Sequence, residues 1–128
     1  MAILDDVGAA LQTAGIGTLG TSLFLGELPE TDVSPVLAVM EYAGEPGEST
    51  FGGPVTEISR LQLVGRGGSY TEARAKVEAA YDALDGTGAS SGVPALYIKA
   101  LQPPFRLGTD DQQRVLVICN LRAVRKHP

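Results

Sequence analysis

Residues 57–84 constrain the fold more than any other stretch, because the spacing of their apolar side chains changes halfway along. Up to Arg66 the residues alternate, as a strand requires. One face carries Leu61 and Leu63, and the other carries Arg60, Gln62 and Arg66. From Ser69 onward the apolar positions fall three and four residues apart, which is typical of a helix. The stretch predicts a strand that leads directly into a helix, and the rest of the chain must pack on this pair.

A capping box and a glycine-rich junction mark the start of this helix. Ser69 is followed three residues later by Glu72, a pair that satisfies free backbone amides at a helix N-terminus. Glycines 65, 67 and 68 come just before it, and we interpret them as a hinge where the chain reverses. The stripe expected to face the core consists of Ala73, Val77, Ala80, Tyr81 and Leu84.

The other segments predict one further helix and several strands. Ile3 to Ala14 has a helical apolar stripe with two aspartates near its start, and Gly15 is expected to end it. Pro103 and Pro104 are expected to end a strand, because proline cannot donate to a ladder. Strands are predicted at Ser22–Leu25, Val36–Tyr42, Glu57–Arg66, Ala95–Leu101 and Arg114–Arg125. We therefore predict an α+β fold, an antiparallel sheet of four to five strands with two helices packed on one face, in a single domain over residues 1–128.

The closing strand combines an apolar face with a mixed one. Its alternation puts Val115, Val117, Cys119, Leu121 and Ala123 on the face expected to point to the core. The opposite face carries Leu116 and Ile118 beside Arg114, Asn120 and Arg122. Two apolar side chains at one end of that face are unfavourable in open water, so we expect a neighbouring subunit to cover them.

The segment from Gly44 to Pro54 connects two strands and contains four glycines and two prolines. This composition is expected to exclude regular structure, and a connection of this length is commonly functional or unstructured. A mobile hairpin loop and a docking arm both stay open as interpretations. Phe51, an aromatic residue in a polar segment, favours the docking arm.

Composition and charge narrow the function classes. A single cysteine, Cys119, excludes an internal disulfide and a four-cysteine metal site. The net charge of -5 argues against a protein that grips duplex DNA, although Arg122, Arg125 and Lys126 crowd the C-terminus. The sequence contains neither a signal-peptide pattern nor an apolar run of membrane-spanning length. We expect a soluble chain made in the host cytoplasm, with no membrane partner.

The sequence offers few groups for catalysis. His127 lies beside the C-terminus and Cys119 lies in an apolar strand, so neither is expected to act as a base or nucleophile. The glycines before the second helix could cradle a phosphate at the helix start. The P-loop and dinucleotide fingerprints are absent, however, and Glu72 would repel a phosphate. We predict no catalytic residue and no cofactor.

Three carboxylates form the remaining chemical alternative. Asp110 and Asp111, together with Asp32, could supply oxygen ligands to a metal ion. Adjacent carboxylates in a turn are more often solvated turn residues, and we predict no metal site. A small metal- or phosphate-binding enzyme stays as the alternative from another function class.

Long stretches of the chain carry a resemblance to a known family. The segment LQLVGRGGSYTEARAKVEAAYDAL is followed by a strand and then by PPFRLGTDDQQRVLVICNLRAV. These stretches, with the opening MAILDDVGAALQTAGIGTLGTSLFLGELPE, resemble the small tail terminator and minor capsid proteins of long-tailed bacteriophages over nearly the whole chain. The motifs are a Gln-centred strand ending in Arg-Gly, an Ala-rich helix, and a Pro-x-x-x-Leu-Gly-x-Asp turn before the closing strand.

The resemblance implies a structural protein of the virion tail, at the head-tail junction, and no enzymatic activity. Such a subunit is expected to form a homo-hexameric ring that caps the tail tube and joins the tail to the head. The implied partners are the major tail tube protein and a head-completion or neck protein. Genomic DNA is expected to pass through the lumen without specific binding, which agrees with the acidic charge. A head-completion or neck adaptor of the same junction is the alternative.

Candidate contact residues come from the family resemblance and from the alternation of the closing strand. The resemblance implies the strand face from Arg60 to Arg66, the turn from Gly108 to Asp111, and the loop around Phe51. The mixed face of the closing strand adds the others. The full set of candidate contacts to a neighbouring subunit or to the tail tube is Phe51, Arg60, Gln62, Arg66, Gly108, Asp110, Asp111, Arg114, Leu116, Ile118 and Arg122.

Overall fold

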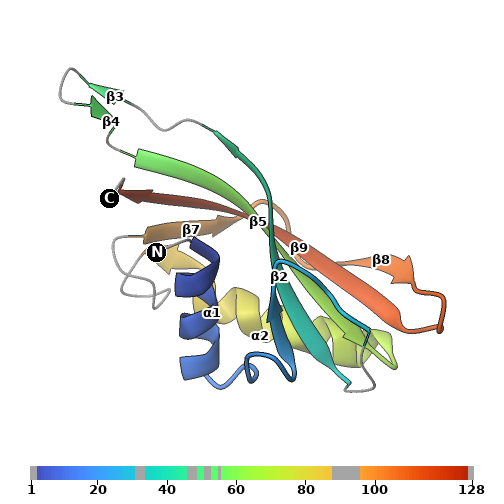
Figure 1. Cartoon of the computed structure of the whole chain (residues 1–128). Helices are drawn as coiled ribbons and strands as arrows, with labels where there is room; N and C mark the ends of the chain where they lie inside the picture. The colour runs from blue at the N-terminus through green and yellow to red at the C-terminus, as the bar shows by residue number, and fades with distance from the viewer. Residues whose placement is uncertain are drawn as a thin grey trace.

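A curved sheet with two helices on one face forms the body of the molecule (Figure 1). The computed structural model describes residues 3–30, 34–45, 49–50, 53–54, 56–87 and 96–126. The helices are α1 (Ile3–Thr13) and α2 (Tyr70–Leu84). The strands are β1 (Leu23–Leu25), β2 (Val36–Glu45), β3 (Ser49–Thr50), β4 (Gly53–Pro54), β5 (Thr56–Gly67), β6 (Gly86–Thr87), β7 (Leu96–Ala100), β8 (Phe105–Thr109) and β9 (Val115–Lys126).

The main sheet is mixed and has seven strands. Its order is β1-β2-β5-β9-β7-β6, and β8 also pairs with β9. The α+β class with helices on one face is confirmed, but the sheet is larger than the four to five strands predicted. It is also not wholly antiparallel, because β1 runs parallel to β2. A parallel neighbour requires a connection that returns along the strand, and this connection lies between Leu25 and Val36.

The hydrophobic core lies between the sheet and the two helices. Leu61, Leu63, Cys119 and Leu121 point inward from β5 and β9, as the alternation predicts. The buried stripe of α2 also matches its prediction, with Ala73, Val77, Ala80 and Leu84 in the core and Tyr81 partly buried against it.

Gly65 lets α2 approach the sheet closely. A Cβ at this position would lie 2.6 Å from both the carbonyl oxygen of Ala73 and Cγ2 of Val77. None of glycines 65, 67 and 68 has a positive φ, and the first two still belong to β5. Our interpretation of these glycines as a reversal hinge is therefore wrong for Gly65, which is needed for close packing rather than for an unusual backbone conformation.

The predicted helix ends are confirmed. At the start of α2, the amide of Glu72 donates to Oγ of Ser69 at 3.3 Å, and the amide of Gly68 donates to Oε2 of Glu72 at 3.1 Å. After α1, Gly15 has φ of 78° and its amide donates to the carbonyl of Gln12, while Ile16 donates to Leu11. This pair of bonds is the Schellman arrangement, which stops a helix.

One strand was not predicted from the sequence. We expected residues 103–113 to form only a connection, but Phe105–Thr109 forms β8, which pairs with β9 in line with β7. Pairing along this edge of β9 passes from β7 to β8 across Gln102–Pro104, where the thiol of Cys119 donates to the carbonyl of Gln102 at 3.2 Å. The two prolines end β7 as predicted, and the chain resumes pairing beyond them.

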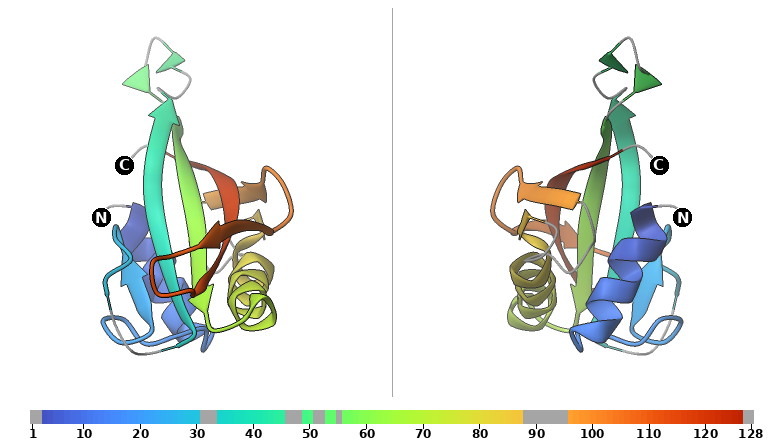
Figure 2. Two further views of the ribbon diagram at one scale, coloured as in Figure 1. Left: turned by 90° about the vertical axis from the view of Figure 1, so that its right-hand side faces the viewer. Right: turned by 90° about the vertical axis from the view of Figure 1, so that its left-hand side faces the viewer.

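A long β-hairpin arm projects from the body (Figure 2). It consists of the ends of β2 and β5, which stay paired out to Glu45 and Ile58, and the small β3–β4 ladder at its tip. The prediction that residues 44–54 lack regular structure is therefore wrong for Gly44 and Glu45, which belong to β2, and for Ser49–Thr50 and Gly53–Pro54. Glycine and proline disfavour strands, but pairing between the two strands, which are already aligned where they leave the body, outweighs this local preference. Among the described residues, no helix is long and apolar enough to cross a membrane.

Candidate functional site

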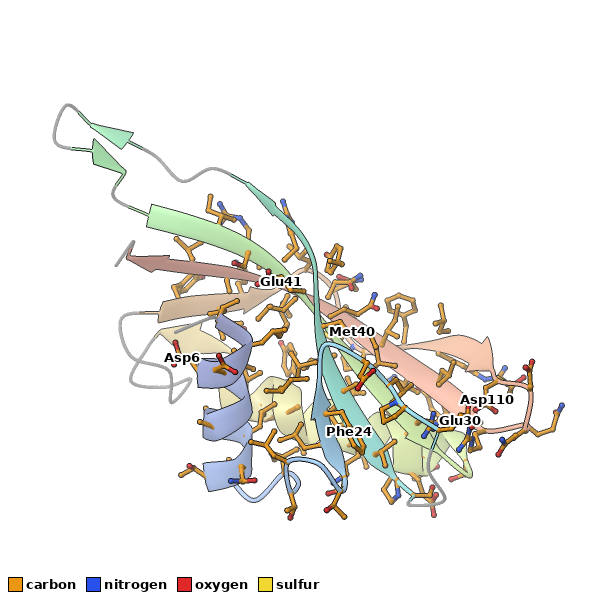
Figure 3. All side chains as sticks on the ribbon, in the orientation of Figure 1. Asp6, Phe24, Glu30, Met40, Glu41 and Asp110 are labelled. Carbon is orange, nitrogen blue, oxygen red and sulfur yellow. The ribbon has the colours of Figure 1, made fainter. Side chains whose placement is uncertain are left out.

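The sheet face that carries no helix divides into two halves, and we call it the outer face (Figure 3). Its residues follow from the strand register, which sets Arg60 opposite Arg122, Gln62 opposite Asn120, Val64 opposite Ile118 and Arg66 opposite Leu116. Residues of β2, β7 and β8 extend the same face on either side. This face holds most of the candidate contact residues.

The first half is covered by the chain itself. Residues 26–30 leave β1 and cross to β5 and β9, where Nη2 of Arg66 donates to the carbonyl of Pro29 at 2.8 Å. Underneath, Val36, Ala38 and Val64 are buried. Arg66 itself is only 3% exposed. We call this the covered half, and its side chains are not available to a partner in this conformation.

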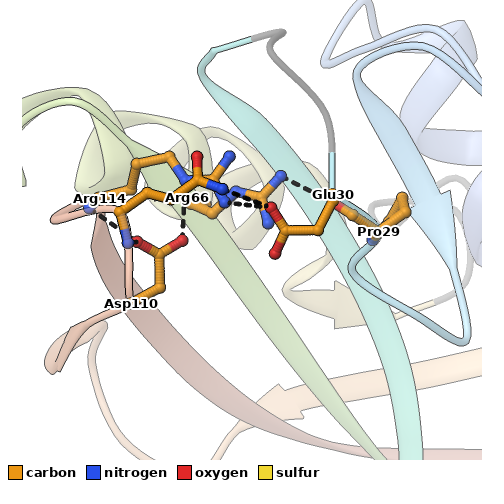
Figure 4. A network of polar contacts seen from close by, with 6 residues as sticks. Pro29, Glu30, Arg66, Asp110 and Arg114 are labelled. Atoms are coloured by element: carbon orange, nitrogen blue, oxygen red, sulfur yellow. Dashed lines mark hydrogen bonds and ion pairs between the residues drawn. The ribbon is translucent and has the colours of Figure 1, made fainter.

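A polar clasp fastens the crossing segment to the β8–β9 turn (Figure 4). Oε2 of Glu30 accepts from Nη2 of Arg114 at 2.8 Å and from Nε2 of Gln112 at 3.1 Å. Nε of Arg114 also donates to Oδ2 of Asp110 at 2.8 Å. Oδ1 of Asp110 accepts from the amides of Gln112 and Arg114, and so shapes the turn. Two segments more than 80 residues apart are thus joined over the end of the sheet.

The clasp shifts the pKa values of its members. Burial raises the pKa of the Asp110 carboxyl, but hydrogen bonds from the Arg114 amide and guanidinium and from the Gln112 amide outweigh burial, so the pKa is lowered overall. For Arg114, burial lowers the pKa, and the carboxylates of Glu30 and Asp110 raise it overall. The pKa of Arg66 is lowered, first by burial and then by the charge of Arg114. Arginine nevertheless stays protonated at neutral pH, so the clasp is ionic there.

The second half of the outer face is open, and we call it the open half. Tyr97, which lies opposite Val124, is 42% exposed, and Leu101, whose amide donates to the Asn120 carbonyl, is 45% exposed. Phe105, opposite Ile118, is also exposed. Large apolar side chains grouped on one face are typical of protein interfaces.

Three cationic residues lie among these apolar side chains. Arg122 of β9 lies between Arg60 of β5 and Lys99 of β7, because the register sets it opposite both. Side chains directly opposite each other have Cβ atoms about 5 Å apart, and like charges at that spacing destabilise a sheet. We call Arg60, Lys99 and Arg122 the basic patch. On the β2 side of the patch, Ala43 lies opposite Arg60 and Glu45 lies opposite Ile58, so the register also brings a glutamate position next to Arg60.

The structure places the candidate contact residues in several different environments. Arg66 and Ile118 are buried, and Asp110 and Arg114 are engaged in the clasp. Arg60, Arg122 and Leu116 are partly exposed on the outer face, as is Gln62, whose Nε2 donates to Oδ1 of Asn120 at 2.9 Å. Gly108 stands at a register shift in β8 with φ of 155°, and Asp111 is exposed in the turn. Phe51 lies outside the described residues.

The expectation that Leu116 and Ile118 need a neighbouring subunit is wrong for Ile118. This side chain is buried within its own chain, beside Val64 and opposite Phe105 of the strand that was not predicted. Leu116 is partly buried. Strand alternation fixed the face of each side chain but did not indicate that β8 would supply a neighbour.

Four residues of the open half were also not predicted from the sequence. Tyr97, Lys99 and Leu101 share one face of β7 and its continuation, and a period of two in residues 97–101 would have grouped them. Phe105 belongs to β8 and could be placed only once that strand was known. For Lys99, the sequence signal was that the neighbouring positions on the same face, Tyr97 and Leu101, carry no carboxylate that could pair with the lysine.

The alternative chemical sites find no support in the described part of the chain. No group of three His, Cys, Asp or Glu residues there could hold a metal ion, and Asp32 lies outside it. The Gly68 amide at the start of α2, which a phosphate would need, donates to the Glu72 carboxylate. Burial raises the pKa of the Cys119 thiol to about 11, so this thiol is a poor nucleophile.

Comparison with known proteins decides the family. The family model of the bacteriophage tail terminator protein matches residues 10–126. The chain belongs to the bacteriophage tail terminator family. A chain in the structure titled "Virion of native gene transfer agent (GTA) particle" has the same fold, with a TM-score of 0.66, 14% sequence identity, and coverage of 98% of this chain and 96% of that chain. No curated protein sequence matches.

Membership of the tail terminator family confirms the main expectations. The protein is a structural component of the phage virion, located in the tail, and it is not an enzyme. The small metal- or phosphate-binding enzyme is therefore excluded as an alternative. A tail terminator in a virion particle associates with other tail and head proteins.

Proposed function

We propose that this tail terminator forms a ring that caps the phage tail tube and joins the tail to the head. The match of the family model over residues 10–126 carries this proposal. We further propose that the ring is a homo-hexamer, that the chain acts as one unit over residues 1–128, and that its partners are the major tail tube protein and a head-completion or neck protein. The virion origin of the chain with the same fold supports a role in a particle.

Two surfaces of the subunit support assembly into a ring. The arm projects away from the body (Figures 1 and 2). The open half presents exposed apolar side chains and the exposed Lys99. These are different surfaces of one chain. A contact between different surfaces generates a closed ring when the rotation between subunits is suitable.

The charge of the chain supports passage of DNA through the ring. Each copy carries a net charge of -5, so six copies carry about -30, which opposes adhesion of the phosphate backbone. A basic patch that faced the lumen would work against this effect. We therefore propose that the basic patch faces a neighbouring protein and that genomic DNA passes without specific binding.

Tails assembled without the protein test the proposal. Phage carrying a stop codon early in this gene are expected to produce tail tubes of excessive and variable length that do not join to heads. Complementation with the wild-type chain should restore the length and produce a ring at the head-proximal end, seen by negative-stain electron microscopy. Tubes of normal length in the mutant would contradict a capping role.

The same experiment separates the alternative at this junction. A head-completion or neck adaptor is needed after the tube is complete, so its absence would leave tails of normal length beside unjoined heads. The family match favours the terminator. A size measurement adds a second check, because six chains of 13.3 kDa form a particle of about 80 kDa.

A further inference from the structure

We propose that the sheets of neighbouring subunits join edge to edge, with β8 of one copy paired to β2 of the next. The segment of β2 at this joint is residues 40–42, and the segment of β8 is residues 105–107. This inference rests on the proposed ring and names the contact between its subunits. Open strand edges, strand direction and side-chain complementarity each support it.

Both strands have an edge that is open in the described part of the chain. There, β1 pairs with β2 only from Leu37 to Val39, so the rest of β2 has no strand on that side. β8 pairs with β9 alone among the described strands. An open strand edge presents backbone amides and carbonyls that can pair with a further strand. The subunit thus carries two such edges, on opposite sides of its sheet (Figure 1).

The strand directions suit a contact between copies in the same orientation. β2 is antiparallel to β5, β5 to β9, and β9 to β8, so β8 runs opposite to β2. When two copies stand side by side, β8 of one therefore meets β2 of the other as an antiparallel pair. The helices of both copies then lie on the same side of the joined sheet. Each copy offers one edge of each kind, so the contact can repeat around a ring.

One register of this joint matches opposite charges. Glu41 lies opposite Leu61 of β5, which is a core residue. Arg106 lies opposite Val117 of β9, which is also a core residue. Glu41 and Arg106 are therefore both on the face of the sheet that carries the helices, and both are exposed. Opposite charges at directly opposed positions stabilise a strand pair, so Arg106 of one copy is expected to face Glu41 of the next.

In this register, apolar side chains meet on both sides of the charged pair. Tyr42 falls opposite Phe105, and Met40 falls opposite Leu107. Tyr42, Phe105 and Leu107 are 49%, 39% and 58% exposed in the subunit, and Met40 is partly exposed. A slip by one residue would set Glu41 against Phe105 or Leu107 and lose the ion pair. Charge and apolar contacts thus select the same register.

Each of the two edges also carries a bulge. The pairing of β2 with β5 shifts between Glu41 and Ala43, and that of β8 with β9 shifts between Arg106 and Gly108. Bulges in edge strands hinder unselective pairing with other chains. We therefore expect the joint to form on the tail tube, where copies are held side by side, and not between free chains.

The register also sets the displacement between neighbouring copies. Arg106 is level with Val117 of β9, whereas Glu41 is level, through Leu61, with Leu121 of β9. The two levels are four residues apart, from Val117 to Leu121, so each copy is shifted along the strands by about 13 Å relative to the previous one. A sheet that closes on itself needs such a stagger, with its strands tilted against the axis.

Cysteine cross-linking on tail tubes tests the joint in the full chain. Met40→Cys with Leu107→Cys keeps the charged pair and places two thiols opposite each other at every joint. Cys119 is buried and does not compete. After assembly on purified tail tubes and mild oxidation, non-reducing gels are expected to show a ladder of covalent multimers up to the size of the ring. Absence of this ladder would overturn the proposal.

Control variants measure the specificity of the cross-link. Each single variant should give less than about one tenth of the multimer yield, because a disulfide requires Cα atoms within about 7 Å. Met40→Cys with Leu19→Cys is the matched control. Leu19 is 39% exposed but lies between α1 and β1, away from β8. Equal ladders from this control and from the test variant would contradict the proposal.

Charge exchange tests the register. Adding Arg106→Glu to the cysteine variant is expected to lower the multimer yield at least about tenfold, because two glutamates then face each other. Adding Glu41→Arg as well should restore the yield to within about threefold, because the two charges are then exchanged. A loss that this second change does not restore would overturn the register.

Hydrogen exchange separates this inference from its rivals. The amides of residues 105–109 should exchange at least about tenfold more slowly after assembly. Protection without a cross-link between copies would mean that a strand of the tail tube protein covers β8, and the inference would be wrong. If the ladder forms while electron microscopy shows no closed ring, the joint holds and the proposed ring fails. If a closed ring forms without the ladder, the proposed ring holds and the joint fails.

Discussion

The covered and open halves of the outer face share strands β5 and β9 yet differ in exposure to solvent. In the covered half, Val64 and Arg66 are buried, Arg66 donates to the Pro29 carbonyl, and the clasp joins Glu30 to Arg114. In the open half, Tyr97, Leu101 and Phe105 stay exposed around the basic patch. A cationic side chain at one position in β5 is therefore part of the interior, and another six residues earlier faces outward. The difference lies in what crosses over each residue and not in the strand that carries it.

From this contrast we expect effects on stability from one half and effects on assembly from the other. Substitutions in the covered half should change unfolding, because they leave buried polar groups or cavities. Substitutions in the open half should change association and leave unfolding nearly unaffected. The division into halves would be contradicted if substitutions in the covered half changed only association, or if substitutions in the open half changed unfolding.

The largest effect is expected for Arg66→Ala. The change removes the donor to the Pro29 carbonyl and leaves a cavity beneath the crossing segment, which should lower the free energy of unfolding by about 2–4 kcal/mol. Urea unfolding at pH 7, followed by far-ultraviolet circular dichroism, measures it. Arg122→Ala, in the open half of the same sheet, serves as the control and should change it by less than about 0.5 kcal/mol. Equal effects at the two positions would refute the division into halves.

A smaller, pH-dependent loss is expected for Asp110→Asn. The folded state lowers the pKa of this carboxyl, so its ionised form stabilises the fold above the pKa of the unfolded chain. That contribution disappears as the pH falls through the folded-state pKa. Wild type should therefore be more stable than the variant at pH 7, and the two should converge near pH 2. Unfolding curves across this range check it, and a difference that does not depend on pH would show that the charge of Asp110 is unimportant.

A weaker effect is expected for Glu30→Gln. The Glu30 side chain is 76% exposed, although its partner Arg114 is only 15% exposed, so solvent screens the ion pair and its loss should cost about 0.5 kcal/mol or less. The effect should fade in 1 M salt, where screening is nearly complete. A loss above about 2 kcal/mol would mean that the clasp acts as a buried network.

The smallest effect, and one of opposite sign, is expected for Arg122→Gln. Removing the middle charge of the basic patch relieves repulsion from Arg60 and Lys99, so the variant should unfold at a slightly higher urea concentration, equivalent to about 0.2–0.5 kcal/mol. Sedimentation of the variant with tail tubes should at the same time show weaker association. A clear loss of stability would indicate that the patch supports its own fold.

Local patterns were sufficient to predict the elements that local chemistry defines. The change of period between β5 and α2, the capping box at Ser69 and the stop at Gly15 depend on residues a few positions apart, and each is present. The alternation in β9 also placed Leu121 and Arg122 on opposite faces correctly. These features follow from backbone geometry, which the order of residue types reveals directly.

The features that the sequence did not reveal depend on contacts between residues far apart in the chain. β8 follows two prolines and contains Gly108, so its strand character depends on β9 rather than on its own residues. The burial of Arg66 and Ile118 depends on residues 26–30 and on β8, both distant in sequence. For the same reason the candidate contacts could be placed on a face of the sheet, but the accessible ones could not be separated from those inside the subunit.

The unbroken pairing of β5 with β9 has a mechanical consequence. All twelve residues of β5, from Thr56 in the arm to Gly67 before α2, are in register with β9. At about 3.3 Å per residue this ladder is about 40 Å long. A load pulling on the arm along its length would be shared by all of these hydrogen bonds in shear, instead of opening them one after another. The strand that anchors the arm is therefore suited to carry tension along its length through the subunit.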